Sequence, residues 1–151
     1  MFLDCKNISF RYPGNSQPVL SDLSFHLEKP GFHALFGPSG VGKTSFAKII
    51  SKQIDEFDGE LLAGGGPVLY SYNLERLPGW SSVGVHLDKI TPKSRRNLQH
   101  ELVEVFGLSP YMDMRFSQLS LGQKNRINLL RYLLQDFGTL IMDESLGNVD
   151  E

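Results

Sequence analysis

The chain has 151 residues, of which 40% are hydrophobic and 21% are charged, a composition that suits one globular domain with a sizeable core. Its formal net charge of −2 gives no overall attraction to nucleic acid or to anionic lipid, so no nucleic-acid partner is expected. The N-terminus lacks the apolar stretch of a signal peptide, no run approaches the roughly 20 apolar residues of a membrane span, and the single cysteine excludes an internal disulfide and favours an intracellular setting.

The chain begins with two strand patterns separated by a turn. Broken apolar/polar alternation runs from Leu3 to Phe10 and again from Val19 to Leu27, with Pro13-Gly14-Asn15-Ser16 between them. This arrangement predicts two antiparallel strands. Tyr12 follows the first strand, where its ring can stack on a purine base or simply pack against the protein.

A glycine-rich stretch comes next, between a second kind of strand pattern and a helix pattern. Phe32-His33-Ala34-Leu35-Phe36 is typical of a short buried strand. A helix is predicted from the apolar residues that recur at helical spacing, which are Phe46, Ile49, Ile50 and Ile54. Between them, Gly37-Pro38-Ser39-Gly40-Val41-Gly42-Lys43-Thr44 has the G-x-x-x-x-G-K-T spacing of a phosphate-binding loop.

The chemistry of such a loop follows from its residue types. Glycines let the backbone turn its N–H groups inward, and the helix end adds about half a positive charge, so phosphate oxygens fit there. Lys43 is predicted to reach the β- and γ-phosphates, and the Thr44 hydroxyl to ligate Mg²⁺. A glycine-rich turn without a ligand is disfavoured, because strand, loop and helix all agree with the motif. We predict nucleotide contacts from every residue between Gly37 and Ser45, and this loop favours base stacking for Tyr12.

Short strands and a loop follow the first helix. Asp58-Gly59 and Gly64-Gly65-Gly66-Pro67 bracket strand-like pieces, and Val68 to Tyr72 is the strongest of these. Asn73 to Trp80 is predicted to be a loop. An exposed Trp80 would indicate a partner surface, while a buried anchor is equally compatible with the sequence.

A helical piece is predicted next. Thr91-Pro92 has the chemistry of an N-cap followed by proline, and Gly107 is expected to end the helix. One apolar face is formed by Leu98, Leu102, Val105 and Phe106. The basic residues of the first turns, Lys93, Arg95 and Arg96, are interpreted as a solvated face. Ser109-Pro110 starts a shorter turn of helix.

The last helix pattern begins with a capping box. Ser120 is the predicted N-cap, Gln123 lies three positions later, and Ile127, Leu130 and Leu134 form the apolar stripe. Gly138 is expected to stop this helix. Either Ser120 is an ordinary cap, or the helix end that it caps faces an anion.

A buried strand that ends in two acids follows. Thr139-Leu140-Ile141-Met142 is a continuous apolar run, typical of a parallel strand buried on both faces, and Asp143-Glu144 comes directly after it. Ligand chemistry in α/β proteins gathers at such strand ends. Because buried carboxylates are costly without a cation, Mg²⁺ is predicted beside them.

Taken together, these motifs resemble the ATP-binding cassette family over the whole chain. They are Tyr12, the loop at 37–44, Leu119-Ser120-Leu121-Gly122-Gln123, the strand at 139–142 with Asp143-Glu144, and Gly147-Asn148-Val149-Asp150. The resemblance implies an α/β fold: a P-loop NTPase core with a mainly parallel sheet, an antiparallel β subdomain and a small helical subdomain at about 85–125. Residues 1–151 would form one nucleotide-binding domain that is incomplete at its C-terminus.

The family also implies roles for individual residues. Tyr12 would stack on adenine, Asp143 would hold the Mg²⁺ shell, and Glu144 would orient or deprotonate the attacking water, with Lys43 as the other catalytic residue. Ser120, Gly122 and Gln123 would contact the γ-phosphate bound by a second cassette in a head-to-tail dimer, whose interface the loop with Asp150 crosses.

One stretch narrows the resemblance within the family. The run Glu75-Arg76-Leu77-Pro78-Gly79-Trp80 is similar to that of nitrate, sulfonate and taurine importer ATPases, and it puts Asn73 in the place of a metal-binding glutamine. The expected function is therefore the ATPase subunit of an importer, bound to a separate membrane permease on the cytoplasmic face of the cell membrane, with ATP and Mg²⁺.

Three departures from the family keep an alternative open. Leu121 replaces a glycine of the signature, Asn73 is one methylene shorter than glutamine, and the sequence ends at Glu151 before the family's switch histidine. A non-hydrolysing or fragmentary regulatory cassette is the alternative that they favour. A DNA-repair cassette is less favoured, because residues 45–118 contain no sustained heptads and no cysteine.

Overall fold

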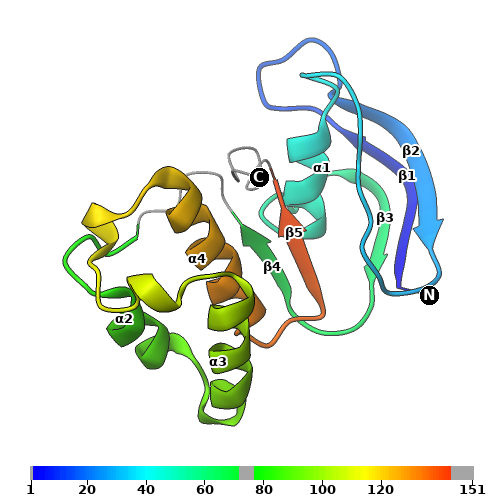
Figure 1. Cartoon of the computed structure of the whole chain (residues 1–151). Helices are drawn as coiled ribbons and strands as arrows, with labels where there is room; N and C mark the ends of the chain where they lie inside the picture. The colour runs from blue at the N-terminus through cyan, green and yellow to red at the C-terminus, as the bar shows by residue number, and fades with distance from the viewer. Residues whose placement is uncertain (1, 72–76, 144–151) are drawn as a thin grey trace. The chain divides into compact units, whose positions relative to one another are not determined.

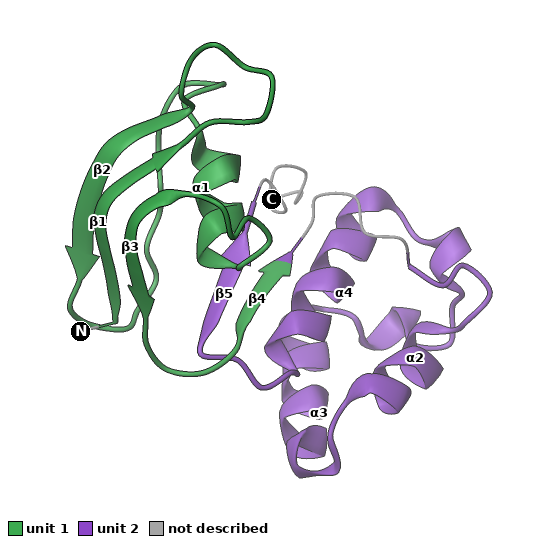
Figure 2. Ribbon diagram, turned by 180° about the vertical axis from the view of Figure 1, so that it is seen from behind, with its two compact units in different colours: residues 1–70 green, residues 71–151 purple. Residues whose placement is uncertain are grey.

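The computed structural model describes residues 2–71 and 77–143. The chain divides into two compact units, residues 1–70 and residues 71–151, which Figure 2 shows in green and purple. Figure 1 gives the order of the elements along the chain. Each unit is described by itself.

Unit 1 is built on a three-stranded antiparallel sheet. Its strands are β1 (Leu3–Phe10), β2 (Leu20–Leu27) and β3 (Asp58–Ala63), in the order β2-β1-β3. In the register, Cys5 of β1 lies between Phe25 of β2 and Leu61 of β3. The two antiparallel strands predicted at the N-terminus are confirmed, and the sequence between 58 and 63 supplies the third.

One helix belongs to this unit. It is α1 (Lys43–Ile50), which buries Phe46, Ile49 and Ile50 as the helical spacing predicted. Ile54, assigned to the same stripe, lies beyond the end of the helix. The ring of Phe46 packs edge-on against that of Phe25 in β2, with centroids 5.4 Å apart. This contact fixes α1 against the sheet, and with it the loop that precedes α1.

The prediction of a strand at residues 32–36 is wrong. This segment forms neither a strand nor a helix, and the exposed fractions of Phe32, Leu35 and Phe36 are 82%, 59% and 89%. An apolar run predicts a buried strand only if neighbouring strands pair with it, and among the described residues no strand does so. Since the segment is not a strand, the expectation that it lies parallel to the strand at 139–142 in one sheet is wrong as well.

The second sheet has two strands, β4 (Val68–Ser71) and β5 (Thr139–Met142). Both segments were predicted to be strands, and both are confirmed. The boundary between the units falls within β4. All four residues of β5 are half-buried, so the prediction that this strand is buried on both faces is wrong. The apolar side chains of β5 are therefore only partly shielded from solvent.

Unit 2 is mainly helical. Its helices are α2 (Val83–Ile90), α3 (Arg96–Val105) and α4 (Leu121–Leu133), with short 3-10 turns at Lys93–Arg95, Ser109–Tyr111 and Phe116–Gln118. Their buried side chains form one apolar cluster, which contains Val83, Leu87, Val103, Leu108, Phe116, Leu119, Ile127, Leu130 and Leu134. The turn of helix predicted at Ser109 is confirmed, and α4 ends before the Gly138 predicted to stop it.

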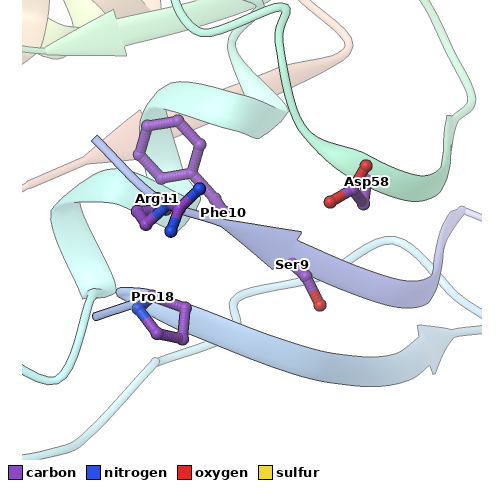
Figure 3. A pocket seen from close by; sticks show the side chains of 5 residues that line it. All are labelled: Ser9, Phe10, Arg11, Pro18 and Asp58. Atoms are coloured by element: carbon purple, nitrogen blue, oxygen red, sulfur yellow. The ribbon is translucent and has the colours of Figure 1, made fainter. Parts of the chain in front are cut away.

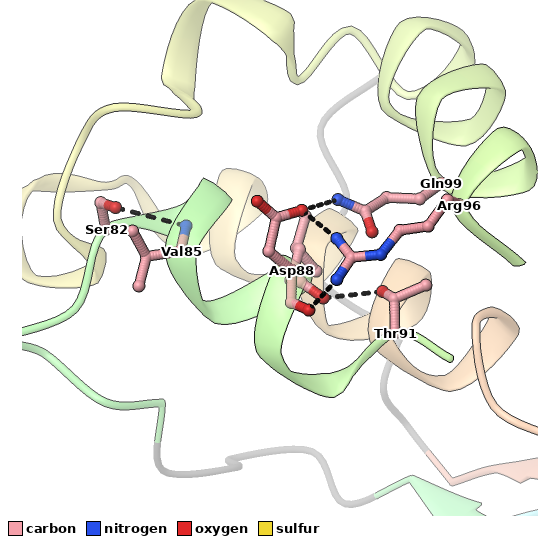
Figure 4. Close-up of polar contacts among 7 residues, drawn as sticks. Ser82, Val85, Asp88, Thr91, Arg96 and Gln99 are labelled. Carbon is pink, nitrogen blue, oxygen red and sulfur yellow. Dashed lines mark hydrogen bonds and ion pairs between the residues drawn. The ribbon is translucent and has the colours of Figure 1, made fainter. Parts of the chain in front are cut away.

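Thr91 has a different role from the predicted N-cap. It is the C-terminal cap of α2, and its buried hydroxyl donates a 2.7 Å hydrogen bond to the carbonyl of Leu87 (Figure 4). A threonine hydroxyl can accept from an N–H ahead of it or donate to a C=O behind it, and here the second option is taken. The next helix starts at Arg96, and Gly107, with φ of 63°, follows its end as predicted.

Two of the three basic residues are not on a solvated face. Arg96 pairs with the carboxylate of Asp88 and donates to its carbonyl, and Gln99 donates to the same carboxylate at 2.9 Å (Figure 4). Arg95 donates to the carbonyl of Leu133, the last residue of α4, and to that of Gln135 beyond it. Only Lys93 is exposed as expected. The interpretation fails because charge counting ignores acceptors elsewhere in the chain, which lie 8 residues away for Arg96 and 40 residues away for Arg95.

No helix among the described residues is long and apolar enough to span a membrane. This agrees with the hydropathy of the sequence.

The buried thiol of Cys5 gives a first testable result. Burial, and after it the neighbouring Asp4, raise the pKa of Cys5 to about 11, and the thiolate is the form that reacts. At pH 8 we therefore expect a disulfide reagent such as DTNB to leave the native chain unlabelled for as long as it stays folded. The urea-denatured chain is the control and should release one equivalent at once. Immediate labelling of the native chain would contradict the burial of Cys5.

Candidate nucleotide-binding site

The loop Gly37–Thr44 of unit 1 is exposed except at the half-buried Gly42 and Lys43, and it leads into α1. Gly40 and Gly42 have φ values of 82° and 101°, which only glycine adopts without strain. At Gly42 a Cβ atom would also lie 2.8 Å from the side chain of Leu20 and 3.0 Å from the carbonyl oxygen of Val19. The loop therefore passes so close to the start of β2 that position 42 accepts no side chain.

The Lys43 side chain folds back over this loop. Its ammonium donates hydrogen bonds to the carbonyl oxygens of Gly37 (2.8 Å) and Pro38 (2.9 Å). Gly42 is the N-cap of α1 and provides no side-chain cap, so no side chain occupies the N–H groups of the first turn from that position. A cation and a helix N-terminus thus lie at one exposed loop, which is the arrangement that a phosphate group requires.

The residues after Lys43 divide into an exposed and a buried hydroxyl. Thr44 is exposed at the first turn of α1, while Ser45 is buried. The Ser45 hydroxyl lies 3.1 Å from the hydroxyl of Tyr12, so the two share a hydrogen bond across 33 residues of sequence. The Tyr12 ring packs edge-on against Phe10, with centroids 4.7 Å apart. Tyr12 is therefore held beside α1, a contact that no local sequence signal announces.

The capping box at the start of α4 is confirmed in unit 2. The Ser120 Oγ accepts from the Gln123 N–H at 3.2 Å, and the Gln123 Oε1 accepts from the Ser120 N–H at 2.8 Å. Gly122 is buried, whereas Leu121 is 49% exposed. The cap satisfies two backbone N–H groups at the Ser120 end of α4, and the exposed apolar side chain of Leu121 lies beside it.

The acidic residues are only partly described. Asp143 follows β5 and is half-buried, while Asn73, Glu144 and Asp150 lie outside the described residues. Within residues 2–71 and 77–143, no group of three or more His, Cys, Asp or Glu side chains is arranged to hold a metal ion. The predicted Mg²⁺ ligands are instead a hydroxyl, a carboxylate and an amide, which are oxygen donors of the kind that Mg²⁺ prefers.

A pocket of about 240 Å³ lies elsewhere in unit 1, at the carboxyl end of β1 (Figure 3). It is lined by Ser9, Phe10, Arg11, Pro18 and Asp58. None of the predicted site residues lines it. The pocket is open and carries both a positive charge, from Arg11, and a negative charge, from Asp58, so it does not indicate a particular ligand.

The chain matches one protein family model and resembles curated import ATP-binding proteins. Residues 20–147 match the family model described as ABC transporter. The taurine import ATP-binding protein TauB of Pseudomonas fluorescens is 32% identical over 161 residues, which cover 98% of this chain and 61% of TauB. The aliphatic sulfonates import ATP-binding protein SsuB of Bacillus cereus is 30% identical over 142 residues, covering 87% of this chain and 57% of SsuB. The chain thus spans about three fifths of the length of these curated relatives.

The fold has a counterpart among solved structures. A protein from Pyrococcus furiosus described as an ABC transporter ATP-binding protein superposes with a TM-score of 0.80 at 24% identity, covering 99% of this chain and 78% of the other. The likeness confirms the predicted α/β fold class. The family match covers the phosphate loop, the capped signature and the strand that precedes Asp143, and the chain belongs to the ABC transporter family.

Proposed function

We propose that the chain is the ATP-binding and ATP-hydrolysing part of an importer subunit. The observation that carries the proposal is the exposed loop Gly37–Thr44, in which the Lys43 ammonium lies over the loop beside the uncapped first turn of α1. Taurine and sulfonate import proteins among the relatives support the importer class.

Binding is assigned to residues of unit 1. The backbone N–H groups of the loop and of the first turn of α1 hold the phosphates, and Lys43 exchanges its two carbonyl acceptors for phosphate oxygens. The Tyr12 ring offers a face to the base while its hydroxyl stays bonded to Ser45. Thus one hydrogen bond links the base position to the helix that follows the phosphate loop.

Hydrolysis is assigned to the acidic residues and to the signature. Thr44, Asp143 and Asn73 would hold Mg²⁺, which neutralises developing charge on the phosphates when bound. Glu144 orients or deprotonates the attacking water. Ser120, Gly122 and Gln123 contact the γ-phosphate bound by a second cassette, and Asp150 lies in the loop at that interface. A permease at the cytoplasmic face of the membrane is the second partner, with the exposed Trp80 as a candidate contact.

A non-hydrolysing cassette is the second candidate function. The exposed Leu121 favours it, because an isobutyl group projects from the first residue of α4, where a glycine would leave room for phosphate. Such a cassette would bind ATP through the loop without turning it over.

Two measurements on the purified chain separate these functions. We expect saturable binding of a fluorescent ATP analogue, because the loop is complete, and slow phosphate release that stops when EDTA removes Mg²⁺. Binding without Mg²⁺-dependent release above a heat-denatured control would select the non-hydrolysing cassette. Absence of saturable binding would refute both functions.

A further inference from the structure

Two arginines of unit 2 bind the C-terminal ends of α3 and α4. Arg95, which directly precedes α3, donates hydrogen bonds to the carbonyls of Leu133 (3.2 Å) and Gln135 (2.8 Å) at the end of α4, and it pairs with Asp136. Arg126 of α4 donates to the carbonyl of Phe106, the C-cap residue of α3, at 3.1 Å. We call Arg95 and Arg126 the arginine clamp.

The contacts of the clamp have a common physical basis. The last carbonyls of a helix have no partner within the helix and carry partial negative charge, so a guanidinium satisfies them by hydrogen bonding and by charge. The side chain of Arg95 is 29% exposed, whereas that of Asp136 is 79% exposed. Since an exposed ion pair contributes little, the carbonyl contacts are the main part of the Arg95 interaction.

The clamp fixes the direction of α4 relative to α3, which apolar packing alone does not determine. Burial of the α4 stripe in the core of unit 2 is non-directional, and it permits some sliding and tilting. Hydrogen bonds have narrow distance and angle limits. Because one arginine acts at the start of α3 and the other at its end, α3 and α4 run in opposite directions and are tied at two separated points.

The position of the Leu133 end of α4 determines where the Ser120 end lies. The 13 residues of α4 make a rod of roughly 20 Å, so a tilt of about 10° at the Leu133 end moves the Ser120 end by about 3 Å. A displacement of this size exceeds the tolerance of a hydrogen bond to phosphate. Ser120 makes its own cap with Gln123, but that cap moves with the helix.

We propose that Arg95 and Arg126 are positioning residues that aim the Ser120 end of α4 at the nucleotide bound by a second copy. This inference rests on the proposed function, in which Ser120 and Gly122 contact the partner's nucleotide. The arginines touch neither nucleotide nor water. They act through the direction of α4.

The test compares Arg95→Met and Arg126→Met with Lys93→Met. The control removes an equal charge from an exposed position of the same basic segment. Affinity for a fluorescent ATP analogue reports on the loop of unit 1, and analytical ultracentrifugation with ATP reports on association of two copies. All samples are measured at a temperature at which circular dichroism shows them fully folded, so a loss of stability alone leaves both readouts unchanged.

We expect both arginine variants to bind the analogue within about twofold of wild type and to associate at least about fivefold more weakly. Arg95→Lys, which keeps a cationic donor, should be intermediate and covers the case in which Arg95→Met does not fold. Lys93→Met should match wild type. Wild-type association in both arginine variants would overturn the inference.

A separate readout keeps the two proposals distinguishable. If the wild type does not associate with ATP, that part of the proposed function fails, and amide hydrogen exchange decides the role of the clamp. At the end of α4 that the clamp holds, the N–H groups of Leu134 and Gln135 bond to the carbonyls of Leu130 and Tyr132, at 3.1 Å and 3.0 Å. Faster exchange of these amides in both arginine variants sustains the inference, and unchanged exchange overturns it.

Discussion

We expect the Lys43→Met variant to bind ATP about 100-fold more weakly than the wild type, a loss of ~3 kcal/mol. Lys43 places a cation on the phosphate loop, and its ammonium is already held over the loop by the carbonyls of Gly37 and Pro38. Methionine keeps the length of the side chain and removes the charge and the donors. Charge-assisted hydrogen bonds to phosphate are therefore lost, while the backbone N–H contacts remain.

The matched control for this experiment is Lys48→Met. Lys48 lies in the last turn of the same helix, α1, so its replacement changes net charge equally without touching the loop. Titration of a fluorescent ATP analogue at fixed ionic strength measures both variants. A dissociation constant for Lys43→Met within threefold of wild type would remove Lys43 from the binding site. An equal loss in both variants would indicate a general charge effect.

The Phe116→Ala variant should lose about 3–5 kcal/mol of unfolding free energy, the usual cost of deleting a buried phenylalanine ring. Phe116 is among the largest fully buried side chains and belongs to the core of unit 2. A domain has only about 5–15 kcal/mol of stability in total, so this change brings unit 2 close to unfolding. Urea denaturation followed by circular dichroism measures the loss. Val105→Ala, at an exposed position of α3, is the control and should shift the midpoint little.

The pH dependence of stability provides a second readout for Phe116. Its ring packs edge-on against His86 at 5.3 Å, and burial, followed by Arg131 and Lys89, lowers the pKa of His86. The unfolded chain therefore binds a proton that the folded chain does not, and the unfolding free energy should fall as pH decreases below about 6.5. Removal of the Phe116 ring exposes His86 and should flatten this dependence. An unchanged slope would mean that Phe116 does not shield the imidazole.

Local chemistry in the sequence was sufficient for several elements. The capping box of Ser120 and Gln123 depends on residues three apart, and the structure forms it as predicted. The antiparallel pair β1 and β2 follows from alternation with a turn between the strands. The glycines of the phosphate loop have the backbone angles that the motif requires. In each case the interacting groups lie within one short stretch or on strands that are consecutive in the chain, so the local pattern predicts that they meet.

Other features depend on where neighbouring elements end or on partners that are distant in sequence. Residues 32–36 have the composition of a buried strand, but a strand forms only beside a neighbouring strand, and the local pattern does not show whether one is present. Thr91 has cap chemistry that serves either helix end, and its bond to Leu87 is decided by where α2 stops. Arg95 was counted as a surface charge, although its acceptors are 38 and 40 residues away. Such contacts exist only after the chain has folded.

The exposed segment at 32–36 has a consequence for the life of the protein in a cell. It presents Phe32, Leu35 and Phe36 to solvent directly before the phosphate loop. Short apolar windows of high β propensity with no proline add readily to strands of other chains, and chaperones and proteases act on chains that expose them. We therefore expect the abundance of the protein in the cell to depend more on how far residues 32–36 are exposed than on the packing of either core. A Phe36→Lys change, which places a charge in the window, should prolong the cellular half-life even though it adds nothing to the folded interior.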